Sequence, residues 1–576
     1  MPWQNDGSRF DEKWLFYGIS AILISKERTV CMCQKFTADE LNTMDHETKN
    51  DVIYQMQDRL DKLEHDYENL MEQVRLADHQ RFGRHTEKLS EIAGQISLFN
   101  EVEACFDEQV REPSIDDVVD TALKPPRRPK KKGQKEDDLR NFPQEEIPHD
   151  VPAEKLYALF GEGNYKSMPD EICWQLRFEP ARWTAEKHII KVYVGTGGLH
   201  QDEFLRGDHP DTLYRGSIAT PSLLSGIINS KYVNSSPLDR TAREFQTNGL
   251  HLSKQTMSNW VVWSAERFFQ PVYGLMKKIQ LQAHVNQCDE TPLEVIHDDR
   301  PAGSKSYMWV HLTGELSPCP KIIVYEYQKT RHSGHPKEYY KDFQGVLMTD
   351  GLEQYHKLAR EQEGLANANC FAHARRHFAN AIKAMGKGNA EAVKASVAYK
   401  ALVRIGAIYD LEKALKDLSP KERLKERQTS IRPLVEEYFA WIKDVFRQGL
   451  VLPKSETAKG LAYSINQEEY LKVFLTDGEV PIDDSASERA LRNFTIGRKN
   501  WMTINTVRGA QASAVIYSIT ETARANGLNV YYYIKYLLEQ LVTHVDEQGN
   551  IEQSELEPLM PWSKSLPVDC YSKRRN

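Results

Sequence analysis

The chain has 576 residues, a formal net charge of −8, 40% hydrophobic residues and 27% charged residues. At roughly 150 residues per domain, this length suggests about four domains. The balanced composition excludes a globally disordered or fibrous chain, and no apolar run reaches the roughly 18 residues of a membrane span. Mild acidity excludes a histone-like coat of positive charge but leaves local DNA-binding patches open.

The cysteines and the N-terminal segment indicate a cytoplasmic protein. The eight cysteines form no Cys-x-x-Cys pair, only Cys31-x-Cys33, which is typical of reduced thiols rather than a disulfide framework or a zinc ribbon. The apolar stretch 14–24 follows acidic residues and lacks a small-residue cleavage site, so it predicts no signal peptide. Met44, where a helical pattern begins, is a candidate for the true translation start.

Residues 1–43 follow no period and predict a poorly ordered extension, whereas 44–100 predict a coiled-coil helix. The apolar positions are spaced alternately three and four residues apart, which is typical of a zipper seam. A zipper that self-associates is favoured over one helix packed on its own domain, since nothing nearby offers a core. The seam comprises Ile53, Met56, Leu60, Leu63, Tyr67, Leu70 and Val74.

Residues 101–145 predict a charged linker. The segment 101–120 has eight acidic residues and one basic residue, while 121–135 has seven basic residues and no acidic one. A proline-stiffened basic block is extended and cannot pack a core. It either follows DNA phosphates or is a solvated linker, and both readings stay open. The candidate DNA-binding side chains are Arg127, Arg128, Lys130 and Lys131.

Two smaller regions follow the linker. Residues 146–215 alternate in polarity around 173–178 and 188–194, which predicts a small β-rich module. Residues 216–280 predict three helices, opened by Thr220-Pro221, Ser236-Pro237 and Ser253. The last two form a helix-turn-helix-like pair that would place Lys254 in a DNA groove, or a plain helical hairpin.

Residues 281–525 predict a mixed α/β domain. Three consecutive strands at 284–291, 306–312 and 321–327 precede a fourth at 345–351, and helices follow from Leu352 and Ala372. A Lys/Glu-rich helical insertion at about 386–465 either covers an active site, contacting DNA or another subunit, or is a solubilising bundle. Residues 526–576 predict a C-terminal helix and tail. The expected fold class is therefore multidomain α+β.

Three acids of this domain are candidate magnesium ligands. Asp289 lies within the first strand, and Asp350 ends the fourth. The third is Glu488, which we expect on the second turn of a helix capped by Asp483 or Asp484. Carboxylate oxygens suit Mg²⁺, although among 83 acidic residues any one alone is weak evidence. Because Glu290 neighbours Asp289 on a strand, the two side chains should face opposite sides.

Several further motifs occur in a fixed order from about residue 50 to 545. With them the chain resembles the insertion-sequence-sixty-six family of bacterial transposases, which are DDE enzymes with an RNase H-like catalytic domain. The matching segments are Arg81-Phe-Gly-Arg, Lys231-Tyr, Pro237-Leu-x-Arg, Asp289-Glu-Thr, Thr349-Asp350-Gly, Cys370-Phe-Ala-His-Ala-Arg-Arg-His-Phe, 483–492, Ile496-Gly-Arg-Lys-Asn-Trp501 and Thr522-Ala-Arg-Ala-Asn-Gly-Leu.

The resemblance implies a function and its components. Asp289, Asp350 and Glu488 match the family's three metal-binding acids, and Cys370 and His373 match a supporting Cys-x-x-His signature. The cofactor implied is Mg²⁺ or Mn²⁺, with two ions. The implied partners are the DNA ends of a mobile element, target DNA, a second copy joined through the coiled coil, and accessory proteins of the element; no membrane is expected. The protein would lie in the bacterial cytoplasm, on the nucleoid when bound to DNA.

The chain departs from the family in two places. Members commonly carry paired cysteines of a zinc module between the zipper and the helical region, but here that stretch has only Cys173, so no zinc is expected. The family's Asp-Asn-Asn is replaced by Asp483-Asp484-Ser485, which could add negative charge beside the metal ions.

Basic residues flank the acids in sequence. Each could neutralise DNA phosphates near the acidic centre or take part in ordinary surface ion pairs. Those expected to contact DNA are Arg375, Arg376, Arg492, Arg498 and Lys499, with Arg508 in the same downstream cluster.

The predicted reaction is two-metal phosphoryl transfer, in which hydrolysis frees a 3′-hydroxyl that then attacks target DNA. Three alternatives remain. The first is a catalytically inactive DNA-binding relative, and the second is a structure-specific nuclease of the same fold. A two-carboxylate glycosidase is more distant, since no stacking aromatics can be placed beside the acids.

Overall fold

A computed structural model describes residues 43–82 and 212–572, apart from 302, 386–389 and 547, together with a few residues between 185 and 206. The chain divides into two compact units, Met1–Val74 and Arg75–Asn576, and each is described by itself. The predicted DNA-binding residues of the linker, Arg127, Arg128, Lys130 and Lys131, lie outside the described residues, as does most of 146–215. In that stretch β1 (Val192–Val194) pairs antiparallel with β2 (Phe204–Arg206).

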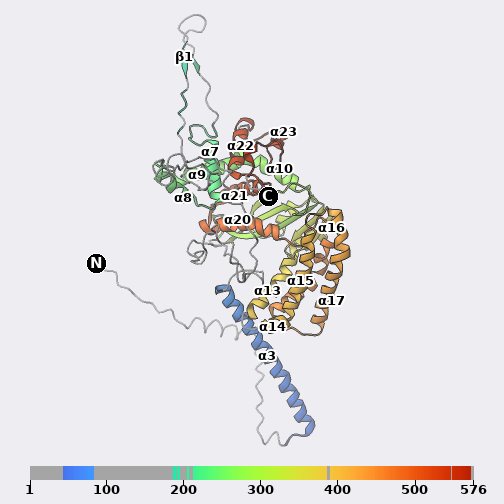
Figure 1. Ribbon diagram of the computed structural model, residues 1–576. Coiled ribbons are helices and arrows are strands. Elements are labelled where there is room, and N and C mark those ends of the chain that lie inside the picture. Colours follow the sequence, from blue (N-terminus) through green and yellow to red (C-terminus); the bar gives the residue numbers. More distant parts are fainter. Residues whose placement is uncertain are drawn as a thin grey trace, which may run out of the picture. The chain divides into compact units, whose positions relative to one another are not determined.

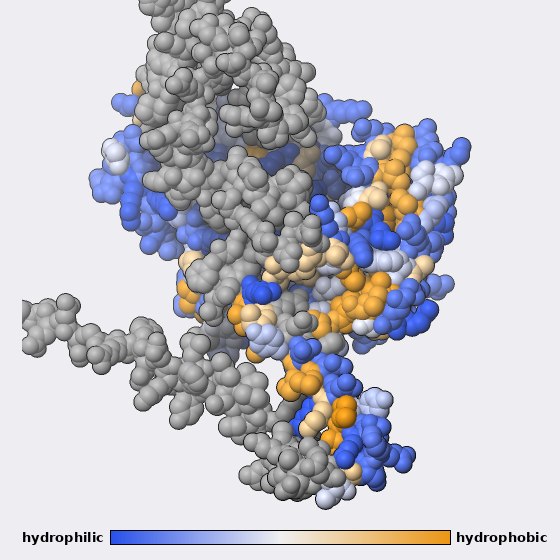
Figure 2. All heavy atoms as spheres, turned by 60° about the horizontal axis from the view of Figure 1, so that its bottom comes forward, coloured by the Kyte–Doolittle hydropathy of each residue, from blue (hydrophilic) through white to orange (hydrophobic). Residues whose placement is uncertain are grey.

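The predicted zipper forms one long helix, α3 (His46–Phe82), which begins within two residues of the expected position. Its apolar seam is exposed along the helix, with Ile53 52% and Leu63 60% accessible. Figure 2 shows these apolar side chains in orange beside blue polar ones. An exposed three-four seam has the pattern of a coiled coil, but self-association remains a prediction.

The helical region keeps the predicted breaks but has more segments than expected. The Thr220 and Ser253 side chains accept hydrogen bonds from Leu223 N and Thr256 N, which caps α7 and α9 as predicted. Asn248 and Gly249, whose φ is +86°, separate α8 from α9. The segments are α7 (Pro221–Ile228), the π-helical η3 (Asn229–Val233), α8 (Leu238–Thr247), α9 (Lys254–Ser264), the π-helical η4 (Ala265–Phe269) and α10 (Gln270–Gln280).

A mixed sheet forms the centre of the larger unit, with strand order β5-β4-β3-β6-β7. β3 is antiparallel to β4 and β4 to β5, whereas β3, β6 and β7 are parallel. The four predicted strands are confirmed. A further strand, β7, lies between the helices that begin near Leu352 and Ala372, and the short β8 pairs with the far end of β3. The strands are β3 (Val285–His297), β4 (Lys305–Thr313), β5 (Ile323–Gln328), β6 (Gly345–Thr349), β7 (Leu365–Asn369) and β8 (Ile504–Thr506).

Helices cover the sheet and form two apolar cores. One core joins the helical region and α20–α22 to β3, β4 and β5, and the other joins α13 to the insertion. The insertion is helical, as predicted, and α15 lies beside α17 (Figure 1). These helices are α11 (Gly334–Tyr339), α12 (Glu353–Glu361), α13 (Phe371–Met385), α14 (Ala390–Ala395), α15 (Val397–Ala414), α16 (Pro420–Glu426), η5 (Arg427–Ile431), α17 (Arg432–Arg447), α18 (Glu456–Asn466), α19 (Glu468–Leu471), η6 (Val473–Leu475), α20 (Ser485–Trp501), α21 (Val507–Ala525), α22 (Val530–His544), α23 (Gln553–Leu556), η7 (Glu557–Leu559) and η8 (Val568–Cys570).

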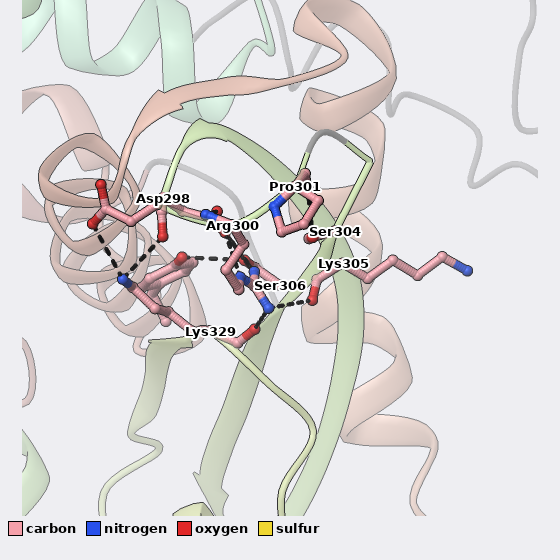
Figure 3. Close-up of polar contacts among 9 residues, drawn as sticks. Asp298, Arg300, Pro301, Ser304, Lys305, Ser306 and Lys329 are labelled. Carbon is pink, nitrogen blue, oxygen red and sulfur yellow. Dashed lines mark hydrogen bonds and ion pairs between the residues drawn. The ribbon is translucent and has the colours of Figure 1, made fainter.

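β3 extends beyond its parallel neighbour β6, and hydrogen bonds fix the turn that follows its far end. Arg300 donates from Nε to the buried Asp298 carboxylate at 3.0 Å and from Nη2 to Ser306 Oγ at 2.6 Å (Figure 3). Lys329, beyond β5, donates to the Asp298 carbonyl at 3.0 Å. These bonds tie three strands together and hold β3 rigid past the point where β6 ends. Within the part of the chain described, no helix has the length and apolarity to span a bilayer.

Candidate catalytic acid site

Strand pairing brings the first two predicted acids together. β3 and β6 run parallel with Val285 opposite Val346 and Gln287 opposite Met348. Continuing this register by two places sets Asp289 opposite Asp350. Neighbouring strands lie about 4.8 Å apart, so the backbones of the two acids are close where β6 ends beside the middle of β3. The charge of Asp350 also contributes to raising the pKa of Asp289, and the shared role of the two acids in one site stays a prediction.

The third acid comes from α20, which packs across β3. Glu488 lies in the first turn of this helix, one turn earlier than expected, and its N–H donates to the Asp484 carbonyl at 3.3 Å. Its carboxylate pairs with Arg376 of α13, with Nη2 to Oε1 at 2.5 Å. Arg376, predicted to contact DNA, therefore engages the third acid in this state.

Negative charge accumulates around Asp289. Burial raises the pKa of its carboxyl to about 8, helped by the charge of Glu290 and, more weakly, by Asp350 and Glu488. The one hydrogen bond described for this carboxyl, from Glu290 N at 2.8 Å, is too weak to offset that effect. A raised pKa caused by burial and by other acids is typical of functional carboxylates.

The adjacent Glu290 faces the other side of β3, as predicted from strand alternation. Its carboxylate is 1% exposed, pairs with Arg331 and accepts a hydrogen bond from Tyr355 Oη at 2.9 Å. Burial raises the pKa of Glu290, while Arg331 acts in the opposite direction. Because its oxygens are occupied by a cation and a phenol, Glu290 has a structural role that Asp289 lacks.

A buried polar network, not anticipated from the sequence, connects the elements that carry the acids. Gln287 Nε2 and Ser487 Oγ both donate to Asp484 Oδ1, at 2.8 and 2.6 Å, and Asp484 N donates to Cys370 Sγ at 3.1 Å. Gln287 precedes Asp289 by two residues on the same strand face, which was the available signal. The network fixes β3, the start of α20 and the start of α13 relative to one another.

The prediction that Asp483 or Asp484 caps the helix of Glu488 is confirmed for the position of Asp484 but not for its side chain. Asp484 occupies the cap position, but its carboxylate accepts no backbone N–H of the first turn. It bonds to Gln287 and Ser487 instead, and burial raises its pKa well above the usual range, with the charge of Asp289 adding to the effect. Asp483 Oδ1 accepts from Ser485 N at 3.0 Å, so Asp483 supplies the local turn. Burial and the neighbouring Asp289 charge therefore both disfavour the charged form of Asp484.

A glycine permits the turn that presents Asp350. Gly351 has φ of +90°, and a Cβ there would lie 2.9 Å from Asn369 Nδ2 and 3.0 Å from Tyr463 Oη. Tyr463 donates to the Asp350 carbonyl at 3.0 Å from α18 of the insertion. The insertion therefore contacts the turn after the second acid. Glycine is required at position 351 because a residue with a Cβ would be strained at this φ and would clash with these two side chains.

The predicted supporting and basic residues divide into several groups. Cys370 is buried and links α13 to Asp484, and His373 Nε2 lies 3.3 Å from Arg376 Nη1, so both lie beside the third acid. Arg498 donates to Thr291 Oγ1 at 3.3 Å, two residues beyond Asp289. The side chains of Arg492, Lys499 and Lys254 are exposed. The Nζ of Lys254 lies 4.0 Å from Oδ1 of Asp239. Arg375 follows Cys370 on α13, whereas Arg508 forms an ion pair with Glu266.

The donor set suits a hard divalent cation. Asp289, Asp350 and Glu488 offer carboxylate oxygens from three parts of the fold. Their mutual repulsion is unfavourable, and a bound cation would relieve it. As the described side chains lie, no three acidic, histidine or cysteine groups are close enough to hold an ion. The Glu488 carboxylate is paired with Arg376 in this arrangement.

The fold defines a multidomain α+β protein in which a helix carrying Glu488 packs against the mixed sheet that carries Asp289. The chain belongs to the IS66 family of transposases. The family model described as "Transposase IS66 family" matches residues 216–512, more than half of the chain. Two further models match, "IS66 C-terminal element" at 518–562 and "Transposase C of IS166 homeodomain" at 69–147.

Similar proteins occur in Sinorhizobium fredii (strain NBRC 101917 / NGR234). The chain is 28% identical over 367 residues to the uncharacterized protein y4jD, covering 62% of this chain and 68% of the relative. It is 27% identical over 363 residues to the uncharacterized protein y4hP, covering 60% and 62%. The chain thus spans about two thirds of these relatives' length, and their names assign no activity.

Proposed function

We propose that this protein is an active transposase with an RNase H-like catalytic domain, in which Asp289, Asp350 and Glu488 hold two Mg²⁺ or Mn²⁺ ions. The observation that carries the proposal is the parallel β3–β6 pairing, whose register, extended by two residues, would bring Asp289 beside Asp350. The strand order β5-β4-β3-β6-β7, with three antiparallel and then parallel strands, supports the RNase H-like assignment.

The bound ions would supply an activated water or 3′-hydroxyl and would stabilise the leaving oxygen. The chain's own residues position the acids. Gln287 and Asp484 hold β3 against α20, and Gly351 permits the turn after Asp350. Arg376 stabilises the Glu488 carboxylate while no metal ion is bound. Once a metal ion displaces it from Glu488, Arg376 would be able to contact a DNA phosphate.

Substrate recognition would use the exposed basic residues of the N-terminal half. Lys254 opens α9, the second helix of the pair separated by Gly249, and its side chain is accessible. That arrangement supports docking of α9 in a DNA groove. The basic residues of the linker, including Arg127 and Lys130, are proposed to follow the phosphate backbone.

Two copies are needed to hold two DNA ends together, and α3 offers the means. Its seam residues are 47–65% exposed and repeat at zipper spacing. Sedimentation of a chain beginning at residue 101 should show weaker association than the full chain. Equal association would exclude α3 as the main contact.

The direct test uses the inverted repeats that should flank the gene. The full chain is incubated with a duplex carrying one repeat and its flank, with Mg²⁺ or with EDTA, and both cleaved and joined products are measured. Metal-dependent cleavage followed by joining is expected. Cleavage without joining would indicate a nuclease of the same fold, and DNA binding without cleavage would indicate an inactive relative.

Variants assign the acids. Asp289→Asn, Asp350→Asn and Glu488→Gln should each reduce cleavage by about 10³-fold or more while DNA binding persists. Glu290→Gln is the matched control, because it removes the neighbouring acid from the opposite face of β3. It should retain cleavage, and full activity in any of the three acid variants would remove that residue from the site.

A further inference from the structure

Lys231 and Trp501, from two motifs with no role so far, meet at one point of the molecule. Lys231 lies in the π-helical η3, and its Nζ is 4.0 Å from the centroid of the Trp501 ring at the end of α20. Asn500 Nδ2 donates to the Ser235 carbonyl at 2.8 Å and holds the two segments together. A π-turn within a helical region is frequently found at a functional site.

The packing around Trp501 leaves little freedom. A Cβ on Gly497 would lie 2.3 Å from Trp501 Cη2 and 2.6 Å from Tyr517 Oη, so the indole ring lies directly over the glycine. Tyr232, next to Lys231, packs edge-on against Tyr517 at 5.0 Å and bonds to Ser513 at 3.3 Å. Lys231 is therefore held in place by aromatic contacts on a rigid support.

The lysine has no counter-ion in the part of the chain described. Burial alone lowers the pKa of Lys231 to about 8, with no acidic group contributing. A cation–π contact compensates only part of the loss of water, and a largely buried ammonium is ordinarily paired with an anion. The same holds for Arg498, whose pKa is lowered by burial and whose described side-chain bond is to Thr291.

These two cations lie along one path from the acids. Arg498 and Trp501 are three residues apart on α20 and so share one side of the helix. Thr291, the partner of Arg498, is two residues beyond Asp289 on the same face of β3. Two positive groups, Arg498 beside β3 and Lys231 beside Trp501, thus lie at the C-terminal part of α20.

We propose that Lys231 and Arg498, supported by Trp501, form a binding site for a phosphodiester group of the DNA strand that enters the acid site. The ligand is a phosphate rather than a stacked base, because Lys231 already lies over the Trp501 ring. This inference rests on the proposed function. It adds Lys231, which is not part of the acid site.

The test measures binding to a short DNA duplex of arbitrary sequence by fluorescence anisotropy, in EDTA, over a range of salt concentrations. Lys231→Met keeps the apolar stem and removes the charge, whereas Lys231→Arg keeps the charge. Loss of one phosphate contact reduces the slope of log affinity against log salt by about 0.9. The ratio of wild-type to Lys231→Met affinity should then shrink about 3-fold between about 50 and about 200 mM salt.

Each outcome decides. A reduced slope for Lys231→Met with a wild-type slope for Lys231→Arg supports the site, and a wild-type slope for Lys231→Met overturns it. Because EDTA removes any metal, failure of the acids in catalysis does not affect this measurement. A full chain that binds no DNA would instead overturn the proposed function.

Should Lys231→Met fail to fold, lysine acetylation of the wild-type protein provides the answer. Mass spectrometry then compares Lys231 with Lys278, an exposed lysine of α10 bonded to Gln553. Protection of Lys231 by the duplex, but not by inorganic phosphate at equal ionic strength, is the expected result. Protection by inorganic phosphate alone, or no protection, contradicts a DNA site.

Discussion

The acid site and the helical insertion both bury charge, and they treat it in opposite ways. In the insertion, the fully buried Arg427 pairs with both Glu412 oxygens and donates to the Phe474 and Asp477 carbonyls at 2.8 and 2.6 Å. At the acid site, Asp289 is buried, and the charges acting on it come from other carboxylates rather than from a cation. A buried charge whose partners are all present is part of the fold, whereas one whose partners are missing indicates a ligand.

Removing a partner in the insertion should give the largest change in stability. Glu412→Gln leaves the Arg427 guanidinium buried without its counter-ion, which costs about 3–5 kcal/mol of unfolding free energy. Urea unfolding of the full chain, monitored at a helical signal, measures this. Glu361→Gln, which breaks the exposed pair with Lys337, is the control and should cost less than about 1 kcal/mol. Equal losses would remove the contrast between buried and exposed charge.

The turn after Asp350 should be next in sensitivity. Gly351→Ala imposes a strained φ and a close contact with Asn369 and Tyr463, for a cost of about 1–3 kcal/mol and a displaced Asp350. Gly303→Ala is the matched control, because its φ is +82° but no atom lies within 4 Å of the added Cβ. Gly351→Ala should therefore lose more stability, and it alone should lose cleavage activity. A larger loss in Gly303→Ala would contradict the close approach.

Asp289 should make metal-free stability depend on pH. Its folded pKa of about 8 lies above the unfolded value of about 3.9, so the folded state holds a proton that the unfolded state releases. That contribution to stability is complete below about pH 4 and is lost as the pH rises toward 8, at up to about 1.4 kcal/mol per pH unit.

Thermal unfolding in EDTA between about pH 6 and pH 8 tests this pH dependence. Asp289→Asn should flatten the decline and unfold at a higher temperature than wild type at pH 8. Adding Mg²⁺ should stabilise the wild type and leave the variant unchanged, since binding energy adds only where the ligand site is complete. A wild-type slope in Asp289→Asn would show that another group is responsible.

Local patterns in the sequence were sufficient for the four main strands and for two of the helix starts. Thr220 and Ser253 cap their helices because short hydroxyl side chains satisfy free backbone N–H groups, which is a local property. The strand carrying Asp289 was likewise evident from alternation, and Glu290 faces away as expected. The family motifs suggested Glu488, and its helix begins directly after Asp484, one of the two predicted cap residues.

Contacts between distant segments could not be predicted in this way. The bond between Gln287 and Asp484 joins residues 197 positions apart, and Tyr463 reaches Asp350 from the insertion. Neither pair follows from periodicity, since each depends on how the sheet and helices pack. The pairing of Arg376 with Glu488 belongs to the same class, because a basic residue near acids predicts equally well a DNA contact or an ion pair.

That last pairing gives the smallest predicted effect and the most direct test of how the acid site opens. A metal ion that binds Glu488 must displace Arg376, so Arg376→Gln should raise Mn²⁺ affinity in the absence of DNA. Because both side chains are more than a third exposed, the gain should be modest, about 2- to 5-fold. Titration calorimetry measures it, with Arg376→Lys as the control that keeps a charge near Glu488. Weaker Mn²⁺ binding by Arg376→Gln would mean that the arginine organises the third acid for the metal rather than competing with it, and the contrast with the permanently paired Arg427 would then disappear.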